Sequence, residues 1–339
     1  MNNNHKIYIV CPAYYATGGT ELLHQLHSKF IERGLNSFIF YTGTNPSKQN
    51  YTDERFKYYV KANEISPIIE DNKNNYLIVP EIYFNSFNYK EINMLYWWLS
   101  VDHFLIPNNF KPEKLIKRDL KAKIKVLFNM SPYNMINKII NKKNVQYHLY
   151  QSHYAKQFLN KLHIRNKLPL SDYINPNVIY KEKIYHKEDI IIYNPQKGND
   201  ISQYLIANSP LSCQWVPIEN MTPEEISKLM SKTKVYIDFG NHPGKDRIPR
   251  EAVLNNCCII TNKKGSAKNN IDIPIPNKYK FENPIESSKQ IYSLIEDIFN
   301  NFETHIAKFT NYKNKILSEE QIFEKQIDIL LNKTINKVR

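Results

Sequence analysis

The stretch FGNHPGKDRIPREAVLNNCCIITNKKGSA, residues 239–267, gives the strongest indication of the fold. It begins where one apolar run, KVYIDF, ends, and it contains a second, CCIIT, at residues 257–261. The chain has only eight glycines, and three of them, Gly240, Gly244 and Gly265, lie here. Because proline is favourable in a first helical turn, we expect a helix to begin near Pro249. Strand, glycine-containing loop, helix and strand together predict a parallel βαβ unit.

The same alternation of strand and helix extends through the rest of the chain. Leu22, Leu26 and Phe30 recur every fourth residue as one helix face. Strands are expected at KIYIV, NSFIFYT, NYLIVPEI, INMLYWWLSV, AKIKVLFN and VQYHLYQS, and again at DIIIYN. Near-continuous apolar strands are typical of parallel sheets that helices cover on both faces. The predicted fold class is therefore α/β, with Rossmann-like doubly wound parallel sheets and a helical C-terminal tail.

The length of 339 residues fits two domains better than one ordinary core. The polar segment LPLSDYINPN separates them, so we place the first domain at residues 1–168 and the second at 176–315. A C-terminal helix is expected at residues 316–339, packing back on the first domain. Two helix starts carry capping-box patterns, one formed by Thr222 and Glu225 and the other by Ser318 and Gln321. Pro223, at the first helical position, further supports the first of them.

The net charge is 46 − 33 = +13, which raises the question of an anionic partner. Lys, Asn, Ile and Tyr are all abundant, a bias typical of AT-rich coding sequences, so part of the lysine content is compositional. The aromatic residues lie in apolar runs and are not interleaved with basic ones, which disfavours nucleic-acid binding. Residues 111–143 hold ten basic residues against Glu113 and Asp119. This cluster suits an anionic membrane surface, and a solvated lysine-rich face is the alternative.

Nothing in the sequence predicts secretion or a membrane span. No apolar run approaches the roughly 18 residues that cross a bilayer, and the amino-terminal segment lacks a signal-peptide core. The four cysteines show no metal-ligand spacing and are interpreted as buried apolar residues in a reducing compartment. We therefore expect a cytoplasmic protein, with peripheral association at the inner membrane as its only membrane contact.

Seven of the eight glycines lie at or just after the carboxyl ends of predicted strands, and Gly34 is a helix stop. Ligands of doubly wound sheets bind at that edge, where glycine permits close approach of the backbone. The alternative is that these glycines only mark turns.

Three segments, TGGTE at residues 17–21, NPQKG at 194–198 and VYIDFG…PREAVLNNCCIIT, resemble in this order the GT-B-fold glycosyltransferases that use nucleotide sugars. The resemblance implies two Rossmann-like domains that face a cleft, with the acceptor mainly on the first and the donor nucleotide mainly on the second. No G-x-G-x-x-G fingerprint is present, which disfavours a nicotinamide-dependent enzyme.

The resemblance makes Glu251 the ligand of the donor ribose. A position near a helix amino terminus agrees with this, since free N–H groups there attract anions; the alternative is a glutamate that only complements the helix dipole. Retaining members of the most familiar group carry two glutamates separated by seven residues, and here Pro243 stands in the first place. The usual donor-sugar contact is then either missing or replaced by the backbone of His242–Gly244, and both the donor sugar and the stereochemical outcome stay open.

Lys197 in NPQKG, followed by Gly198, matches the lysine that meets the diphosphate in many relatives. Lys245, Arg247 and Arg250 are further candidates, and arginine suits bidentate phosphate contacts. Positioned cations can stabilise a departing diphosphate without metal. Since the sequence also lacks an Asp-x-Asp pair, we expect no metal and no cofactor besides the donor substrate.

On the acceptor side, Asp102 and His103 follow a very apolar strand, where either could accept the proton of the attacking hydroxyl. Glu81 is a third candidate base, and a helix cap is the alternative role for Asp102. Substrate contacts are expected in the loop that precedes the first helix, at Gly18, Gly19 and Glu21.

These patterns predict a glycosyltransferase that moves a sugar from a nucleoside diphosphate to a bacterial surface glycan, free or lipid-linked. A nucleotide-sugar epimerase or hydrolase of the same fold is the alternative, and a basic nucleic-acid-binding protein is the less favoured one.

Overall fold

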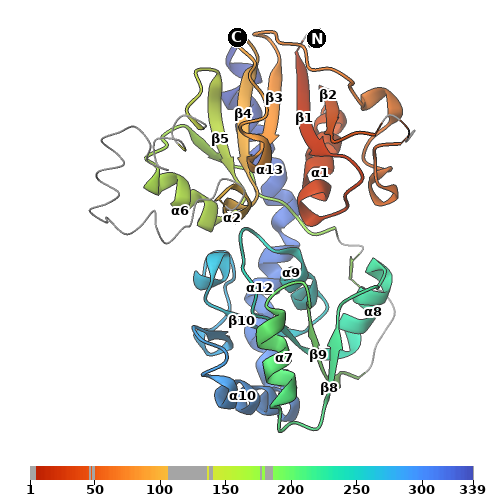
Figure 1. Cartoon of the computed structure of the whole chain (residues 1–339), viewed down its shortest axis with the longest axis vertical. Helices are drawn as coiled ribbons and strands as arrows, with labels where there is room; N and C mark the ends of the chain where they lie inside the picture. The colour runs from red at the N-terminus through yellow and green to blue at the C-terminus, as the bar shows by residue number, and fades with distance from the viewer. Residues whose placement is uncertain are drawn as a thin grey trace. The chain divides into compact units, whose positions relative to one another are not determined.

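The computed structural model describes residues 5–105 except 46, 48 and 49, then residues 136, 140–175, 178–179 and 186–338. The chain divides into two compact units, which are described one at a time (Figure 1). Unit 1 comprises Met1–Asp172 and Phe323–Arg339, and unit 2 comprises Tyr173–Ile322. The division at Asp172 falls inside the polar segment LPLSDYINPN.

Unit 1 contains a parallel sheet whose six described strands run in the order β2-β1-β3-β4-β5-β6. They are β1 (Lys6–Pro12), β2 (Asn36–Thr42), β3 (Tyr76–Pro80), β4 (Asn93–Trp98), β5 (Val145–Tyr150) and β6 (Lys167–Pro169). The helices of this unit are α1 (Gly18–Glu32), α2 (Val101–Leu105) and α6 (His153–Lys161). The strands from NSFIFYT and VQYHLYQS are confirmed, whereas AKIKVLFN lies outside the described residues.

The two faces of this sheet are apolar, as near-continuous strands require. Alternate residues of one face, among them Tyr8, Leu77 and Trp98, form a buried cluster with residues of α2 and α6. Helix α1 buries the expected face, Leu22, Leu26 and Phe30. Its start is fixed by Thr17 and Thr20, whose hydroxyls and backbone N–H groups bond to each other reciprocally.

The last long helix, α13 (Glu319–Lys333), begins in unit 2, and its residues from Phe323 onward belong to unit 1. Phe323, Ile327 and Leu330 are buried at a spacing of four and three residues. Glu324 forms ion pairs with Lys29, at 2.8 Å, and with Arg33, near the end of α1.

Unit 2 contains a second parallel sheet, whose described strands run in the order β11-β10-β9-β7-β8. They are β7 (Glu188–Tyr193), β8 (Gln214–Pro217), β9 (Thr233–Asp238), β10 (Cys258–Asn262) and β11 (Lys280–Phe281). Helices α7 (Asn199–Ala207), α8 (Pro223–Lys232) and α9 (Arg247–Leu254) alternate with them, and α10 (Ser288–Asn300), α11 (Phe302–Ile306) and α12 (Thr310–Leu317) follow. The predicted strand-loop-helix-strand unit is thus β9-α9-β10.

Short 3-10 helices complete the described elements: η1 (Glu54–Phe56), η2 (Ala62–Glu64), η3 (Glu81–Tyr83), η5 (Gly265–Lys268), η6 (Asn277–Tyr279), η7 (Ala307–Phe309) and η8 (Ile335–Val338). No helix in the described part of the chain is both long and apolar enough to cross a bilayer.

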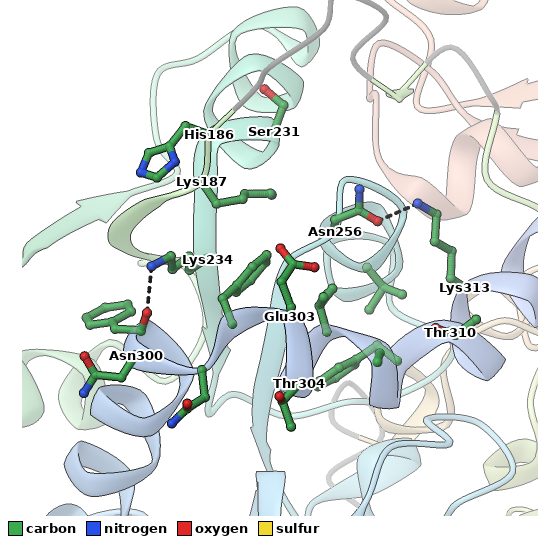
Figure 2. Close-up of a pocket in the computed structure, with 17 residues that line it drawn as sticks. His186, Lys187, Ser231, Lys234, Asn256, Asn300, Glu303, Thr304, Thr310 and Lys313 are labelled. Atoms are coloured by element: carbon green, nitrogen blue, oxygen red, sulfur yellow. Dashed lines mark hydrogen bonds between the residues drawn. The ribbon is translucent and has the colours of Figure 1, made fainter.

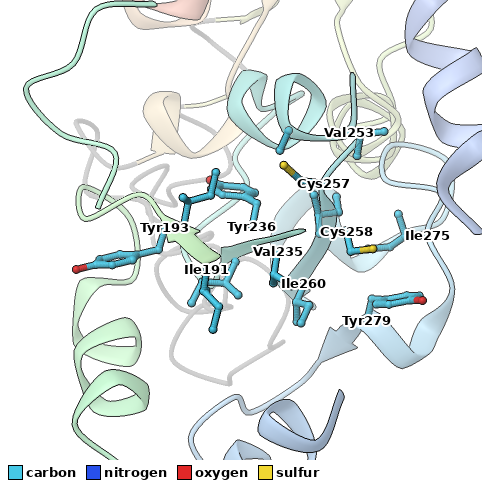
Figure 3. Packing of buried hydrophobic residues seen from close by; sticks show 14 of the residues in the cluster. Ile191, Tyr193, Val235, Tyr236, Val253, Cys257, Cys258, Ile260, Ile275 and Tyr279 are labelled. Atoms are coloured by element: carbon cyan, nitrogen blue, oxygen red, sulfur yellow. The ribbon is translucent and has the colours of Figure 1, made fainter. Parts of the chain in front are cut away.

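The core of unit 2 forms around the middle of its sheet (Figure 3), where Ile191, Val235 and Ile260 are fully buried. Cys257 and Cys258 belong to this core, and Cys11 is buried in unit 1, as expected. Cys213 differs, because it lies just before the edge strand β8 and stays half-buried.

One of the two predicted capping boxes is present. Thr222 and Glu225 exchange both bonds at the start of α8, with Pro223 in the first turn. The prediction of a capping box at Ser318 is wrong. The Ser318 hydroxyl donates to the carbonyl of Lys315, at 2.8 Å, and so binds the end of α12.

Candidate functional site

Two loops of unit 2, after β7 and after β9, touch through their backbones at glycines. Gly198 begins α7 with φ +62°, and a Cβ there would lie 2.7 Å from the carbonyl carbon and oxygen of Phe239. A Cβ on Gly240 would meet the Cβ of Lys197 at 2.5 Å. Any side chain would push the loops apart, so glycine at both positions keeps Lys197 against the loop that precedes α9.

The loop after β10 joins the other two. Asn262 donates to the carbonyls of Phe239, at 2.6 Å, and Gly240, at 2.8 Å. The Ser266 N–H donates to the carbonyl of His242, at 2.8 Å, and a Cβ on Gly265 would lie 2.0 Å from that oxygen. The carboxyl ends of three neighbouring strands therefore carry one packed set of loops, which we call the cradle: residues 197–198, 239–247, 251 and 262–266.

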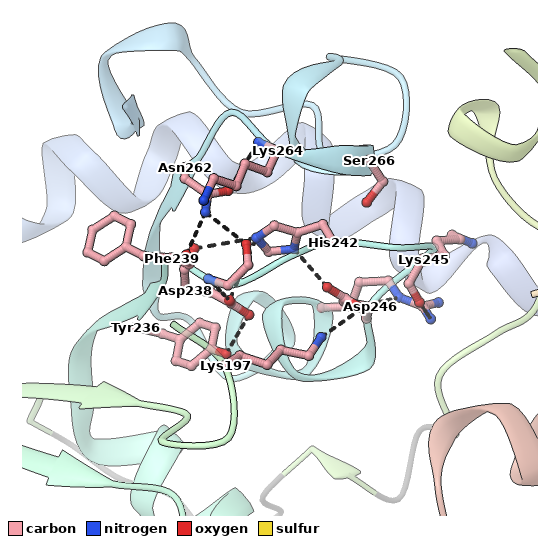
Figure 4. A network of polar contacts seen from close by, with 12 residues as sticks. Lys197, Tyr236, Asp238, Phe239, His242, Lys245, Asp246, Asn262, Lys264 and Ser266 are labelled. Atoms are coloured by element: carbon pink, nitrogen blue, oxygen red, sulfur yellow. Dashed lines mark hydrogen bonds and ion pairs between the residues drawn. The ribbon is translucent and has the colours of Figure 1, made fainter. Parts of the chain in front are cut away.

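Asp246 is the centre of the charged contacts in the cradle (Figure 4). It is the residue before the first turn of α9, and its Oδ1 lies 3.0 Å from Lys197 Nζ. Its Oδ2 lies 2.7 Å from His242 Nδ1. Lys197 and the start of α9 therefore lie together, as their assignment to the diphosphate and the ribose of one donor requires.

His242 is fully buried between two carboxylates. Its Nε2 lies 3.6 Å from Asp238 Oδ1, on the side opposite to Asp246. Burial by itself would lower the pKa of His242, but Asp238 and Asp246 outweigh it and the pKa is raised. Burial likewise opposes ionisation of Asp246, yet His242 and Lys197 lower its pKa. The geometry therefore favours an imidazolium that bridges two carboxylates.

Asp238, His242 and Asp246 are also the residue types that bind metal ions, and one ligand atom of each lies within 4.8 Å of the others. Lys197 and His242, whose pKa is raised, already lie against these two carboxylates. A divalent ion would have to displace the ammonium group and a proton of the imidazole. These side chains therefore fit an ion-pair network better than they fit a metal site.

Two predicted ligands on α9 form an ion pair with each other. Arg247 Nε donates to Glu251 Oε1, one helical turn away. The Arg247 side chain is 29% exposed and that of Glu251 is 11% exposed, so the pair borders the surface. Glu251 lies in the second turn of α9, near the helix amino terminus.

The prediction that Arg250 binds phosphate is wrong, because its guanidinium is only 1% exposed and is bound within the protein. It donates to Glu319 Oε2, at 2.6 Å, and to the carbonyls of Lys245 and Asp246, each at 3.1 Å. Lys245 Nζ lies 2.8 Å from Glu319 Oε1 and is 11% exposed, so this second predicted cation is also largely neutralised. Gly244, another predicted contact, is buried beside it.

At the carboxyl edge of the unit 1 sheet, Gly18 and Gly19 open helix α1. A Cβ on Gly19 would lie 3.9 Å from a methyl group of Leu99, which follows β4. Glu21 is only 6% exposed and accepts from the Tyr59 hydroxyl, at 3.4 Å. Its predicted contact with substrate is therefore not supported: the helix start turns this side chain inward.

Asp102 and His103 lie in α2, directly after β4, as expected. The Tyr154 hydroxyl donates to Asp102 Oδ1, at 3.1 Å, and Asp102 stays partly exposed. His103 is exposed, and its backbone N–H donates to the Ser100 hydroxyl, at 3.2 Å. Both side chains are accessible at the edge where a parallel sheet binds its ligands.

Glu81, the third candidate base, is buried at the end of β3. Its carboxylate accepts from the Leu99 N–H, at 2.9 Å, and burial raises its pKa to about 7. It therefore anchors the turn that leads into α2, beside the two strands whose ends carry Gly19 and Asp102.

Unit 2 also has a cavity of about 860 Å³ at the opposite, amino edge of its sheet (Figure 2). Its ammonium groups are already bound: Lys187 donates to the carbonyls of Met230, Thr233 and Asn255. Lys234 donates to Asp189, at 2.6 Å, and Lys313 donates to the Asn256 side chain. Lysine at helix carboxyl ends is a common structural cap. None of the predicted site residues lines this cavity.

The sequence reasoning missed Asp238, Asp246, Asn262 and Glu319. Asp238 ends an apolar strand, the same signal that selected Asp102, and Asp246 precedes the helix start. Glu319 had no local signal, because it lies 68 residues beyond Glu251. In the basic cluster at residues 111–143 the structure describes only residues 136 and 140–143, so the predicted membrane contact stays a prediction.

Known structures resemble this chain in fold. Sucrose-phosphate synthase from Thermosynechococcus elongatus matches with a TM-score of 0.67 and 11% identity, over 98% of this chain and 100% of that one. HepE from Anabaena, solved with UDP and glucose, matches with 0.65 and 12%, over 96% and 99%. WaaG, a glycosyltransferase involved in lipopolysaccharide biosynthesis, matches with 0.56 and 12%, over 96% and 98%.

No protein-family model matches the sequence, and comparison with curated protein sequences finds no match. The structural likeness covers nearly the whole length of both chains in each case, at low identity. The chain therefore has the GT-B fold of nucleotide-sugar glycosyltransferases, with two Rossmann-like parallel-sheet units.

Proposed function

We propose that this chain is a glycosyltransferase that transfers a sugar from a nucleoside diphosphate to a hydroxyl group of a glycan. The observation that carries the proposal is the position of Lys197 at the start of α9, where it contacts Asp246, the residue before the Arg247–Glu251 pair begins. These residues combine an ammonium group, a guanidinium group and a carboxylate within one set of loops at a helix amino terminus. A diphosphate joined to a ribose needs these partners.

The proposed roles follow from chemistry. Lys197 and Arg247, at the amino terminus of α9, stabilise the charge that develops on the departing diphosphate. Glu251 accepts hydrogen bonds from the ribose hydroxyls. In unit 1, Asp102 accepts the proton of the attacking hydroxyl if the transfer inverts the anomeric centre, and Tyr154 orients its carboxylate.

Metal independence is part of the proposal. Lys197 and the His242 imidazolium balance the carboxylates that would otherwise attract a divalent ion. The cations of the cradle then do the work that a metal does in other transferases. Activity is expected to be unchanged by a chelator.

We also propose a bacterial surface glycan, free or lipid-linked, as the acceptor. The support is the likeness to WaaG, a glycosyltransferase involved in lipopolysaccharide biosynthesis. Peripheral contact with an anionic membrane would suit a lipid-linked acceptor and the net charge of +13.

The test is calorimetry with UDP, GDP and CMP, each in the presence of a chelator. We expect at least one diphosphate to bind. If none binds while oligonucleotides bind tightly and in a salt-dependent way, the protein is a nucleic-acid-binding one. An epimerase or hydrolase of the same fold would consume its nucleotide sugar without any acceptor, which product analysis detects. The anomeric proton coupling of a transferred sugar gives the stereochemistry.

A further inference from the structure

Helix α13 begins in unit 2 with a buried glutamate, Glu319, that contacts two basic residues, Lys245 in the cradle and Arg250 in α9. Glu319 is its first residue and is only 3% exposed. Its two carboxylate oxygens lie 2.6 Å from Arg250 Nη1 and 2.8 Å from Lys245 Nζ. A carboxylate buried this deeply is retained only when cations compensate it, and here two do.

Arg250 connects Glu319 to the loop that precedes α9. Besides Glu319, its guanidinium donates to the carbonyls of Lys245 and Asp246. The planar guanidinium fixes three acceptors in one geometry, so the backbone at residues 245–246 is set by the position of Glu319. The carboxylate on that backbone, Asp246, in turn holds Lys197 and His242.

The charged groups around Glu319 all lie in unit 2. Besides Arg250 and Lys245, Lys315 interacts with Glu319, and Asp272 acts on Lys315 as well. Lys315 is itself bound to the carbonyl of Ile271. Glu319 therefore pairs with Lys245 and Arg250, two of the cations predicted to bind phosphate. Lys197 and Arg247 are the predicted cations that lie nearer the surface.

We propose that Glu319 is a positioning residue of the donor site: through Arg250 it sets the 245–246 backbone, and thereby the placement of Asp246 and Lys197 for a diphosphate. This inference rests on the proposed function of the cradle. It also makes the first turn of α13, the helix that continues into unit 1, part of the donor-binding structure.

The first experiment compares Glu319→Gln with the wild type by calorimetry, using UDP, GDP and inorganic pyrophosphate as probes. The dissociation constant is expected to rise roughly tenfold or more for every probe that binds the wild type, because a misplaced cradle loses phosphate contacts. Glu319→Asp keeps the charge and is expected to recover part of the affinity. Glu296→Gln, an exposed glutamate on α10, is the matched control with wild-type affinity.

Loss of affinity must be separated from loss of stability, since a buried arginine without its partner destabilises the fold. The double variant Arg250→Met with Glu319→Met removes both buried charges and is expected to fold, yet to bind the probes as weakly as Glu319→Gln. Ile295→Val, a cavity-forming change on α10, lowers the melting temperature and is expected to leave affinity unchanged.

Wild-type dissociation constants in folded Glu319→Gln or in the double variant would overturn this inference and leave the proposed function standing. If the wild type itself binds none of the three probes, the proposed function fails, and this inference fails with it.

Discussion

The carboxyl edges of the two sheets carry different kinds of polar contact. In unit 2, Lys197, Asp246 and His242 form a chain of paired charges. In unit 1, the Asp102 carboxylate accepts from the Tyr154 hydroxyl, at 3.1 Å, and the Glu81 carboxylate accepts from the Leu99 N–H, at 2.9 Å. Paired charges hold cations in place before an anion arrives, whereas a buried carboxylate such as that of Glu81, whose pKa is raised to about 7, can take up a proton near neutral pH. This difference agrees with the anion binding proposed for unit 2 and the proton transfer proposed for unit 1.

The largest effect is expected for the proton acceptor in unit 1. Asp102→Asn keeps the size of the side chain and removes its basicity, so turnover should fall by roughly 10²- to 10⁴-fold. The dissociation constant of the nucleotide should not change, because the proposed binding residues lie in unit 2. Initial rates with the donor that binds, together with calorimetry, measure both quantities.

A smaller change in the same contact sharpens this test. Tyr154→Phe removes the hydroxyl that donates to Asp102 and should lower turnover less than Asp102→Asn does. If Asp102→Asn keeps full turnover, the contrast drawn between the two edges is wrong for unit 1.

In unit 2, Lys197→Gln should raise the dissociation constant of the nucleoside diphosphate by roughly 10- to 100-fold, the loss of a charge-assisted contact. Lys289→Gln, an exposed lysine on α10, is the matched control and should bind as the wild type does. An equal loss of affinity in both variants would show that Lys197 acts only through the net charge of the protein.

Glu251→Ala should have a more selective effect, of about tenfold. The affinity for UDP or GDP should fall, because the ribose loses its partner. The affinity for inorganic pyrophosphate should not fall, because Arg247 is released from its ion pair. Calorimetry with both probes distinguishes a ribose ligand from a glutamate that only complements the helix dipole.

The smallest effect concerns the pH dependence of stability. Because Glu81 has its pKa raised from 4.5 to about 7, the folded protein binds more protons than the unfolded chain between these values. The free energy of unfolding should therefore fall as pH rises through this window, by at most about 1.4 kcal/mol per pH unit.

Glu81→Gln removes this titration and keeps an acceptor for the Leu99 N–H. Its unfolding free energy, from urea denaturation at pH 5 to 8, should fall less steeply than that of the wild type. Glu91→Gln, at an exposed position, should follow the wild-type slope. A wild-type slope in Glu81→Gln would show that Glu81 does not titrate in this range.

The elements predicted best from sequence were those with strong local patterns. NSFIFYT forms β2 without any shift, and Thr222 caps α8 as its spacing to Glu225 indicates. The edge strands β6, β8 and β11 were not predicted, because segments of two to four residues carry no apolar run. Their pairing is fixed by the neighbouring strand rather than by their own composition.

The candidate site shows the same limit. Lys197 and α9 were brought together correctly, since both follow strands that are neighbours in a parallel sheet. Arg250 was misplaced, because its helical position does not reveal a partner 69 residues away. Glu21 was misplaced for a related reason, since Tyr59 covers it from a later segment. Local spacing predicts which edge a side chain reaches, and distant contacts decide whether it faces a ligand.

The central claim is that the cradle of unit 2 binds a nucleoside diphosphate. Amide hydrogen exchange, measured with and without UDP and with and without GDP, tests it most directly. The account predicts slower exchange at residues 197–200 and 240–248 with at least one of the two nucleotides. Unchanged exchange in both segments, with protection confined to other parts of the chain or found nowhere, would contradict it.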